Sequence, residues 1–206
     1  MAKELPIGFT AEMVKARQEG RKTVTRRVIK PQPEVFDNAG YPDYVCLKHR
    51  YQVGDLLWLK ESYCHGIEWD DCKPSEVDPL CGGNDIWYFA DGERPTEGWG
   101  KKRSSRFMPK WVARKWLKVL SVRPERVQDI SPEECYAEGI ESQFSKDYKN
   151  RENIPVMPLI KRFIRLWDSI NAKRGYPWES NPWVWRIEFK RVNHKYQIRT
   201  SEISKE

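Results

Sequence analysis

A strict alternation of apolar and charged residues near the end of the chain limits the folds available to it. The alternation lies within the segment 183–192 and sets Trp185, Ile187 and Phe189 against Arg186, Glu188 and Lys190. Successive side chains of a strand point to opposite faces, so this segment predicts a strand with one solvated face. Further strand-like segments lie at about 23–29, 56–61, 86–89 and 111–122. Their long connections favour a mixed, largely antiparallel sheet or small barrel over a doubly wound fold.

Short helices are expected to flank this sheet. Thr10 can cap a first helix, and Ser131 can cap a second, with Pro132 at its first position and Glu134 completing a capping box. Apolar residues at helical spacing predict a third helix at about 158–172. We therefore expect an α+β fold in a single domain, 1–206, with an insertion at about 62–105 and a polar tail at 193–206.

Composition excludes several classes of protein. The chain carries 37 Lys and Arg against 30 Asp and Glu, and no apolar run approaches the roughly 20 residues of a membrane-spanning helix. Its 10 Trp, 9 Tyr and 7 Phe argue against global disorder. The first nine residues lack the apolar core of a signal peptide, and five irregularly spaced cysteines do not form a secreted disulfide framework. We expect a cytoplasmic monomer with reduced thiols and no membrane contact.

Positive charge is concentrated between 101 and 126, where ten basic residues face the single acid Glu125. Phe107, Trp111 and Trp116 are interleaved with them, as in surfaces that neutralise phosphates and stack bases. The other interpretation is a solvated sheet face whose tryptophans belong to the core. The candidate binding residues are Arg106, Trp111 and Arg114, together with a second basic cluster that includes Arg21, Arg26 and Arg27.

The segment from Gly20 to Arg27, Gly-Arg-Lys-Thr-Val-Thr-Arg-Arg, follows the first expected helix. With Gly54-Asp55-Leu56-Leu57-Trp58, the acidic helix at 131–138 and the closing strand, it resembles the ASCH domain of the PUA-like superfamily. The segments 167–171 and 181–184 are most similar to the longer ASCH-like proteins of phages and prophages. The resemblance implies a small β-barrel with flanking short helices and a modified nucleoside or RNA as partner.

The resemblance also implies a reaction. Small bacterial members hydrolyse the amide of N4-acetylcytidine, and their motif places the catalytic roles on Lys22, Thr25 and Glu138. A threonine hydroxyl needs an adjacent base, and a lysine can serve if burial or neighbouring cations lower its pKa. Glu138, at the negative end of its helix dipole, would donate a proton to the leaving amine. Lys22 and Thr25 lie three apart, so they converge only if Lys22 precedes the regular strand.

Alternatives remain open at this point. Lys60 and Glu61 form a second candidate acid/base pair. The chain can equally be a non-catalytic module that binds RNA or a modified base in single-stranded nucleic acid, or a ribonuclease of the ASCH type. Cys64, His65, Cys72 and Cys81 supply ligand types for zinc, but their spacing fits no C-x-x-C site. We expect neither a metal nor a cofactor.

Overall fold

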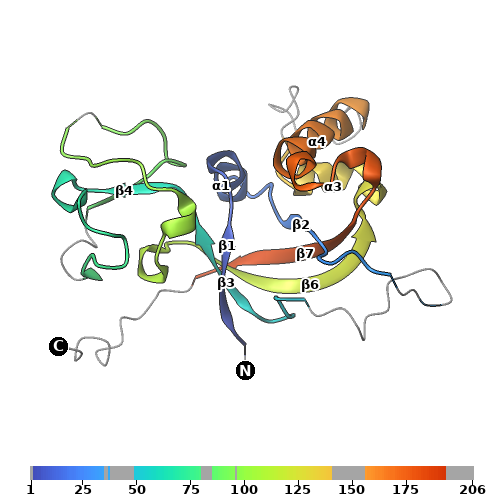
Figure 1. The fold of residues 1–206 in the computed structure, drawn as a ribbon, viewed down its shortest axis with the longest axis horizontal. Coiled ribbons are helices and arrows are strands. Elements are labelled where there is room, and N and C mark those ends of the chain that lie inside the picture. The colour runs from blue at the N-terminus through green and yellow to red at the C-terminus, as the bar shows by residue number, and fades with distance from the viewer. Residues whose placement is uncertain are drawn as a thin grey trace. The chain divides into compact units, whose positions relative to one another are not determined.

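A computed structural model describes residues 2–34, 37, 49–79, 85–95, 97–140 and 156–193. Cys46, Cys81 and all of the expected tail beyond Asn193 lie outside the described residues. The chain combines a mixed five-stranded sheet with a few helices (Figure 1), which confirms the predicted α+β class.

The main sheet has five strands in the order β1-β3-β6-β7-β2, comprising β1 (Glu4–Gly8), β3 (Leu56–Lys60), β6 (Trp116–Arg126), β7 (Trp183–Val192) and β2 (Val24–Val28). β1 runs parallel to β3, whereas β3 with β6 and β2 with β7 are antiparallel. Within the described residues the order ends at β1 and β2, so the sheet is not a closed barrel. A second sheet pairs β4 (Tyr63–His65) with β5 (Ile86–Tyr88).

Three α-helices accompany the sheets in the described residues, namely α1 (Ala11–Gln18), α3 (Pro132–Ala137) and α4 (Val156–Asn171). The side-chain oxygen of Ser131 accepts a hydrogen bond from the Glu134 amide and so caps α3 as expected. Thr10 does the same for α1 through the Met13 amide. α3 and α4 pack against each other (Figure 1). No helix in the described ranges combines the length and apolar character needed to cross a membrane.

The chain forms two compact units, each with its own apolar core. The first contains residues 1–15, 55–118 and 191–206, and its core surrounds Tyr63, Met108 and Trp116. The second contains 16–54 and 119–190, and its core joins α3 and α4 through Cys135, Phe163 and Trp167. The expected insertion at about 62–105 falls in the first unit, and its status as an insertion on a single domain stays a prediction.

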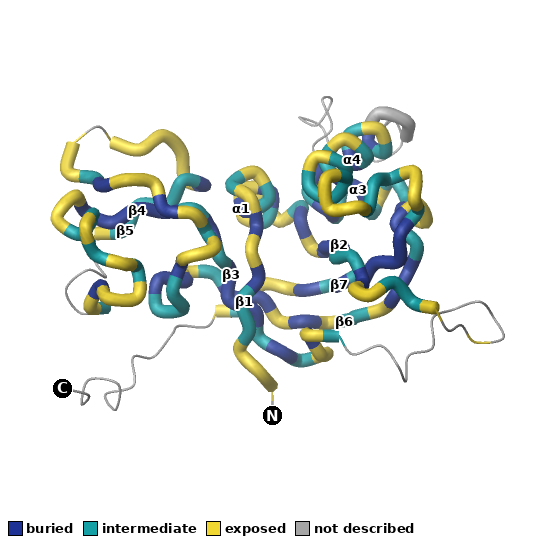
Figure 2. Tube along the Cα trace, in the orientation of Figure 1, coloured by how far each residue is buried: buried dark blue, intermediate teal, exposed yellow. Residues whose placement is uncertain are grey.

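The strand inferred from alternation is β7, and its apolar side is the buried one. Trp185, Ile187 and Phe189 are buried, while Lys190 is exposed. Figure 2 colours the buried stretches of the chain, parts of β7 among them, dark blue. The expected strand at 111–122 begins later, because residues 110–112 form a short 3₁₀ turn that places Val112 in the core.

Candidate functional site

Lys22 is held by the turn that joins α1 to β2. Gly20 adopts a left-handed conformation with φ of 81°, which glycine tolerates without strain. The Lys22 amide then donates to the Ala16 carbonyl oxygen at 3.1 Å, and the Thr23 amide donates to the Ala137 carbonyl oxygen at 2.8 Å. Lys22 therefore precedes the regular strand, as the approach of Lys22 to Thr25 was expected to require.

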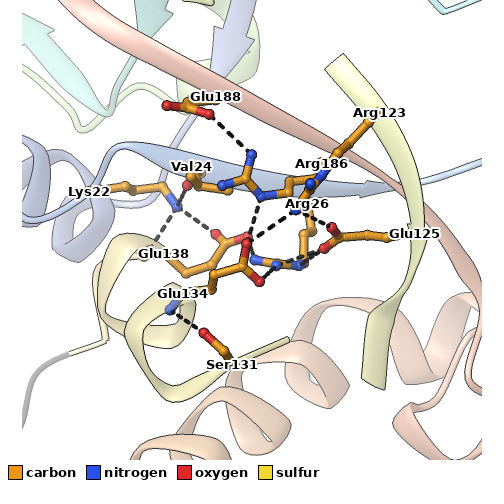
Figure 3. A network of polar contacts seen from close by, with 10 residues as sticks. All are labelled: Lys22, Val24, Arg26, Arg123, Glu125, Ser131, Glu134, Glu138, Arg186 and Glu188. Atoms are coloured by element: carbon orange, nitrogen blue, oxygen red, sulfur yellow. Dashed lines mark hydrogen bonds and ion pairs between the residues drawn. The ribbon is translucent and has the colours of Figure 1, made fainter. Parts of the chain in front are cut away.

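The Lys22 side chain is 0% exposed and ends among three oxygens. Its Nζ donates to Glu138 Oε2 at 2.8 Å, to the Glu138 carbonyl oxygen at 2.7 Å and to the Val24 carbonyl oxygen at 2.9 Å (Figure 3). Burial lowers the pKa of Lys22, and Glu138 opposes this shift only in part. Lys22 and Glu138, two of the three residues implied by the resemblance, are thus brought together.

Glu138 reaches Lys22 because α3 ends in a glycine. Gly139 has φ of 95°, and a Cβ at this position would lie 2.9 Å from the Ala16 Cβ and 3.3 Å from the Lys22 Cβ. Any larger residue would push the end of α3 away from the α1–β2 turn. Gly139 therefore permits the close approach that forms the pair.

Arg26 joins this pair to a larger ionic network (Figure 3). Its side chain is 1% exposed and contacts Glu125 at 2.7 Å, Glu134 at 2.5 Å and Glu138 Oε1 at 3.2 Å. Burial raises the pKa of Glu125. Burial alone would also raise that of Glu134, but Arg26 and Arg186 more than offset it and hold the pKa below its usual value. Arg26, which was predicted as a binding residue, is thus bound to carboxylates of the protein itself.

The sequence interpretation missed the other members of the network. Arg186 donates to Glu134 Oε1 at 2.8 Å and to Glu188 Oε2 at 3.2 Å, and Arg123 lies 3.4 Å from Glu125. Arg186 pairs with Arg26 across the two strands, so both lie on one face of the sheet. The sequence did indicate that Arg186 lies on the charged face of β7. Its place beside Arg26 follows only from the register between β2 and β7, which the sequence alone does not reveal.

Thr25 lies on the other face of β2. It is 3% exposed and pairs with Ile187 of β7, and by alternation its side chain points away from the face that carries Arg26. Arg27 shares the face of Thr25, and burial lowers its pKa. Arg21 donates to the Gly139 carbonyl oxygen at 2.7 Å and binds Glu19. Thr25 therefore faces away from the side of β2 on which Arg26 meets Glu138, and its nucleophilic role stays a prediction.

The alternative acid/base pair has a different environment, in the first unit. Glu61 is 1% exposed, and both of its oxygens accept from Arg114 at 2.9 Å. Lys115 Nζ lies 3.4 Å from Glu61. Lys60 instead donates to the Arg106 carbonyl oxygen. The two neighbours thus have separate partners, and a joint acid/base role stays a prediction.

Most of the basic stretch that suggested a phosphate-binding surface is engaged within the protein. Arg114 also binds Asp91 and stacks 3.7 Å from the Tyr88 ring centroid. Arg103 is buried and donates hydrogen bonds to backbone carbonyl oxygens, and Trp111 packs against the core of the first unit. Lys101, Lys102, Arg106 and Lys118 remain exposed, and Phe107, next to Arg106, is 62% exposed.

The cysteines and histidines do not form a ligand set in the part of the chain that the structure describes. No group of three or more His, Cys, Asp and Glu side chains there could hold a metal ion. Cys64 and Cys135 are buried free thiols, and Cys72 is half-buried. Cys81, the fourth residue considered for zinc, lies outside the described residues.

No protein-family model and no curated protein matches the chain. Among solved structures it is similar to an ASCH domain from Lactobacillus crispatus, with 12% identity over 93% of this chain and 81% of that chain and a TM-score of 0.43. It is also similar to a protein of the DUF984 family from Enterococcus faecalis, with 11% identity over 96% and 87% of the two chains and a TM-score of 0.40. Both likenesses are remote, so the function has to be argued from the chain's own side chains.

Proposed function

We propose that the chain hydrolyses an amide on an acylated nucleobase such as N4-acetylcytidine, with Thr25 as nucleophile, Lys22 as base and Glu138 as proton donor. The observation that carries this proposal is the contact of 2.8 Å between Lys22 Nζ and Glu138 Oε2 at 0% exposure of the lysine. Lys22 lies three residues before Thr25 in the segment 20–27, which resembles part of the ASCH domain. Perturbed, paired ionisable groups of this kind cluster at functional sites.

The pair can supply base and acid together. A shift of one proton converts the ammonium and carboxylate into a neutral amine and a carboxylic acid, a form that burial favours. The amine of Lys22 then takes the proton of the Thr25 hydroxyl as Oγ1 attacks the acyl carbon. This step requires the Thr25 side chain to leave the face opposite Arg26 on which it lies in this structure. Glu138 gives its proton to the departing amine of the base. The products of this half-reaction are the free nucleobase, an acyl ester on Thr25 and the ion pair.

Water completes the cycle. Glu138, now a carboxylate, takes a proton as water attacks the ester carbon. The ammonium of Lys22 returns a proton to Thr25 Oγ1 as the C–O bond breaks. The carboxylic acid product leaves, and the neutral pair is restored. Positioning these three groups around one amide is the largest contribution that the protein can make.

The direct test is incubation of the purified protein with N4-acetylcytidine and a panel of acylated nucleosides, read by mass spectrometry. The variants Lys22→Met, Thr25→Val and Glu138→Gln should each lose about a hundredfold or more in rate. Thr23→Val is the matched control, because Thr23 is an exposed threonine two residues away. A folded protein without turnover on any substrate, or a fully active Thr25→Val variant, would refute the proposal.

A second function is favoured by Phe107. Its 62% exposed ring adjoins the exposed Arg106, in a unit that holds none of the three proposed catalytic residues. A stacking ring beside a cation suits single-stranded nucleic acid. In this case Phe107→Ala should weaken binding of a short single-stranded RNA about tenfold, since each base stacked on an aromatic ring contributes roughly 1–3 kcal/mol.

The control for this binding test is Ile67→Ala, because Ile67 is equally exposed at 63% and lies in the same unit. Fluorescence anisotropy at two salt concentrations provides the measurement, since phosphate contacts make the affinity fall with salt. Equal effects of the two alanine variants would exclude this surface.

A further inference from the structure

Glu138 is held by two different cations, one on each oxygen (Figure 3). Lys22 Nζ contacts Oε2 at 2.8 Å, and Arg26 Nη1 contacts Oε1 at 3.2 Å. The Glu138 side chain is 5% exposed, so water does not compete strongly for either oxygen. The two contacts together fix the rotation of the carboxyl group.

The two cations differ in what they can exchange. A guanidinium stays protonated under all conditions in which proteins function, whereas an amine can lose its proton. A proton can therefore pass between Glu138 and Lys22 but not between Glu138 and Arg26. The contact with Arg26 restricts proton exchange to Oε2, the oxygen that faces Lys22.

Arg26 is itself immobilised from two further sides. Glu125 of β6 accepts from its Nε at 2.7 Å, and Glu134 of α3 accepts from its Nη2 at 2.5 Å. All three nitrogens of the guanidinium thus have carboxylate partners, and these carboxylates come from two elements. A buried fork with three fixed contacts holds an oxygen far more narrowly than a flexible ammonium does.

We propose that Arg26 is a positioning residue for the reaction assigned to Lys22, Thr25 and Glu138: it holds Oε1 of Glu138 so that Oε2 stays on Lys22. This inference rests on the proposed function, because it describes how that site is kept aligned. Arg26 does not touch the substrate or exchange a proton in this scheme, and it acts through Glu138.

The chain contains a matched control for this role. Arg186 pairs with Arg26 across β2 and β7 and binds the same Glu134, but its second carboxylate partner is Glu188 rather than Glu138. A variant of Arg186 therefore removes a cation from the same network without releasing Oε1. If Arg26 served the network only as one charge among several, the two arginines would be equivalent.

The test compares Arg26→Met with Arg186→Met in two measurements. In steady-state kinetics on the acylated nucleoside, Arg26→Met should lower kcat about 10- to 100-fold and change KM little, as expected for lost acid–base alignment. Arg186→Met should stay close to the unchanged protein in both constants. Arg26→Lys keeps a cation but not the fork, so it should follow Arg26→Met and replaces it if that variant does not fold.

The second measurement needs no substrate. The ¹⁵N signal of Lys22 Nζ, followed through a pH titration by NMR, should move to a higher midpoint in Arg26→Met. Burial is the main cause of the lowered pKa of Lys22, and Arg26 adds a smaller charge repulsion that this variant removes. The midpoint should be nearly unchanged in Arg186→Met. Equal shifts in the two variants would overturn the positioning role even if the enzyme is active. Unequal shifts without any turnover would refute the proposed reaction and leave only the hold of Arg26 on Glu138 supported.

Discussion

Replacing Lys22 by methionine tests the energetics of the buried pair directly. The substitution removes three hydrogen bonds from a side chain that is 0% exposed and leaves the Glu138 carboxylate with Arg26 as its remaining cation at 3.2 Å. Breaking one partner of a buried ion pair costs about 3–5 kcal/mol. Since Arg26 stays, we expect the lower end, about 3 kcal/mol in the free energy of unfolding.

Urea denaturation at neutral pH, followed by far-UV circular dichroism, measures this loss. The double variant Lys22→Met with Glu138→Gln should recover part of it, because the unpaired buried charge is gone. Thr25→Val should cost less than about 1.5 kcal/mol, since it replaces a threonine by a residue of the same shape. A loss below about 1 kcal/mol in the free energy of unfolding for Lys22→Met would contradict the burial of the Lys22–Glu138 ion pair.

Three further outcomes are expected. Gly139→Ala should destabilise the protein by about 1–3 kcal/mol more than Gly20→Ala in thermal or urea unfolding; both glycines have positive φ, but only at Gly139 does a Cβ meet a neighbour at 2.9 Å. Burial raises the pKa of Cys135 to about 12, so iodoacetamide at pH 8 should leave this thiol unmodified in the native protein and label it after unfolding, as read by mass spectrometry. Burial also raises the pKa of Tyr63 to about 12 from a usual value of 10. The contribution of the neutral Tyr63 to stability is therefore complete below pH 10 and is lost as the pH rises through 12. The free energy of unfolding should differ less between pH 9 and pH 11 in Tyr63→Phe than in the unchanged protein.

The elements predicted well from the sequence are those with strong local signals. The alternation of 183–192 and the cap at Ser131 needed no information from distant residues. β1 was not predicted, because Glu4–Gly8 contains a proline and the charged pair Lys3 and Glu4 lies at its start. It gains its strand structure by pairing with β3, some fifty residues away. A pairing over that separation leaves no periodic trace in either segment.

The candidate site shows the same limit. Lys22 and Glu138 could be named from the motif, and their contact is present in the structure. The charge pattern did not reveal the partners of the basic residues, because Arg26 and Arg114 are bound to carboxylates that lie far away in sequence. Charge counts record how many cations a segment carries, but only the fold determines how many of them remain open to a phosphate.

The discontinuous course of the chain has a consequence for how such a protein could be shortened in evolution. All of the charged side chains in the Lys22–Arg26 network come from the second unit, which consists of residues 16–54 and 119–190. The stretch 55–118 lies between these two segments and contributes to the other unit. A deletion of that stretch would erase a core and an exposed aromatic ring, yet every ionisable group of the network would still be encoded. The charged network and the exposed ring of Phe107 are therefore encoded by separate stretches of the chain.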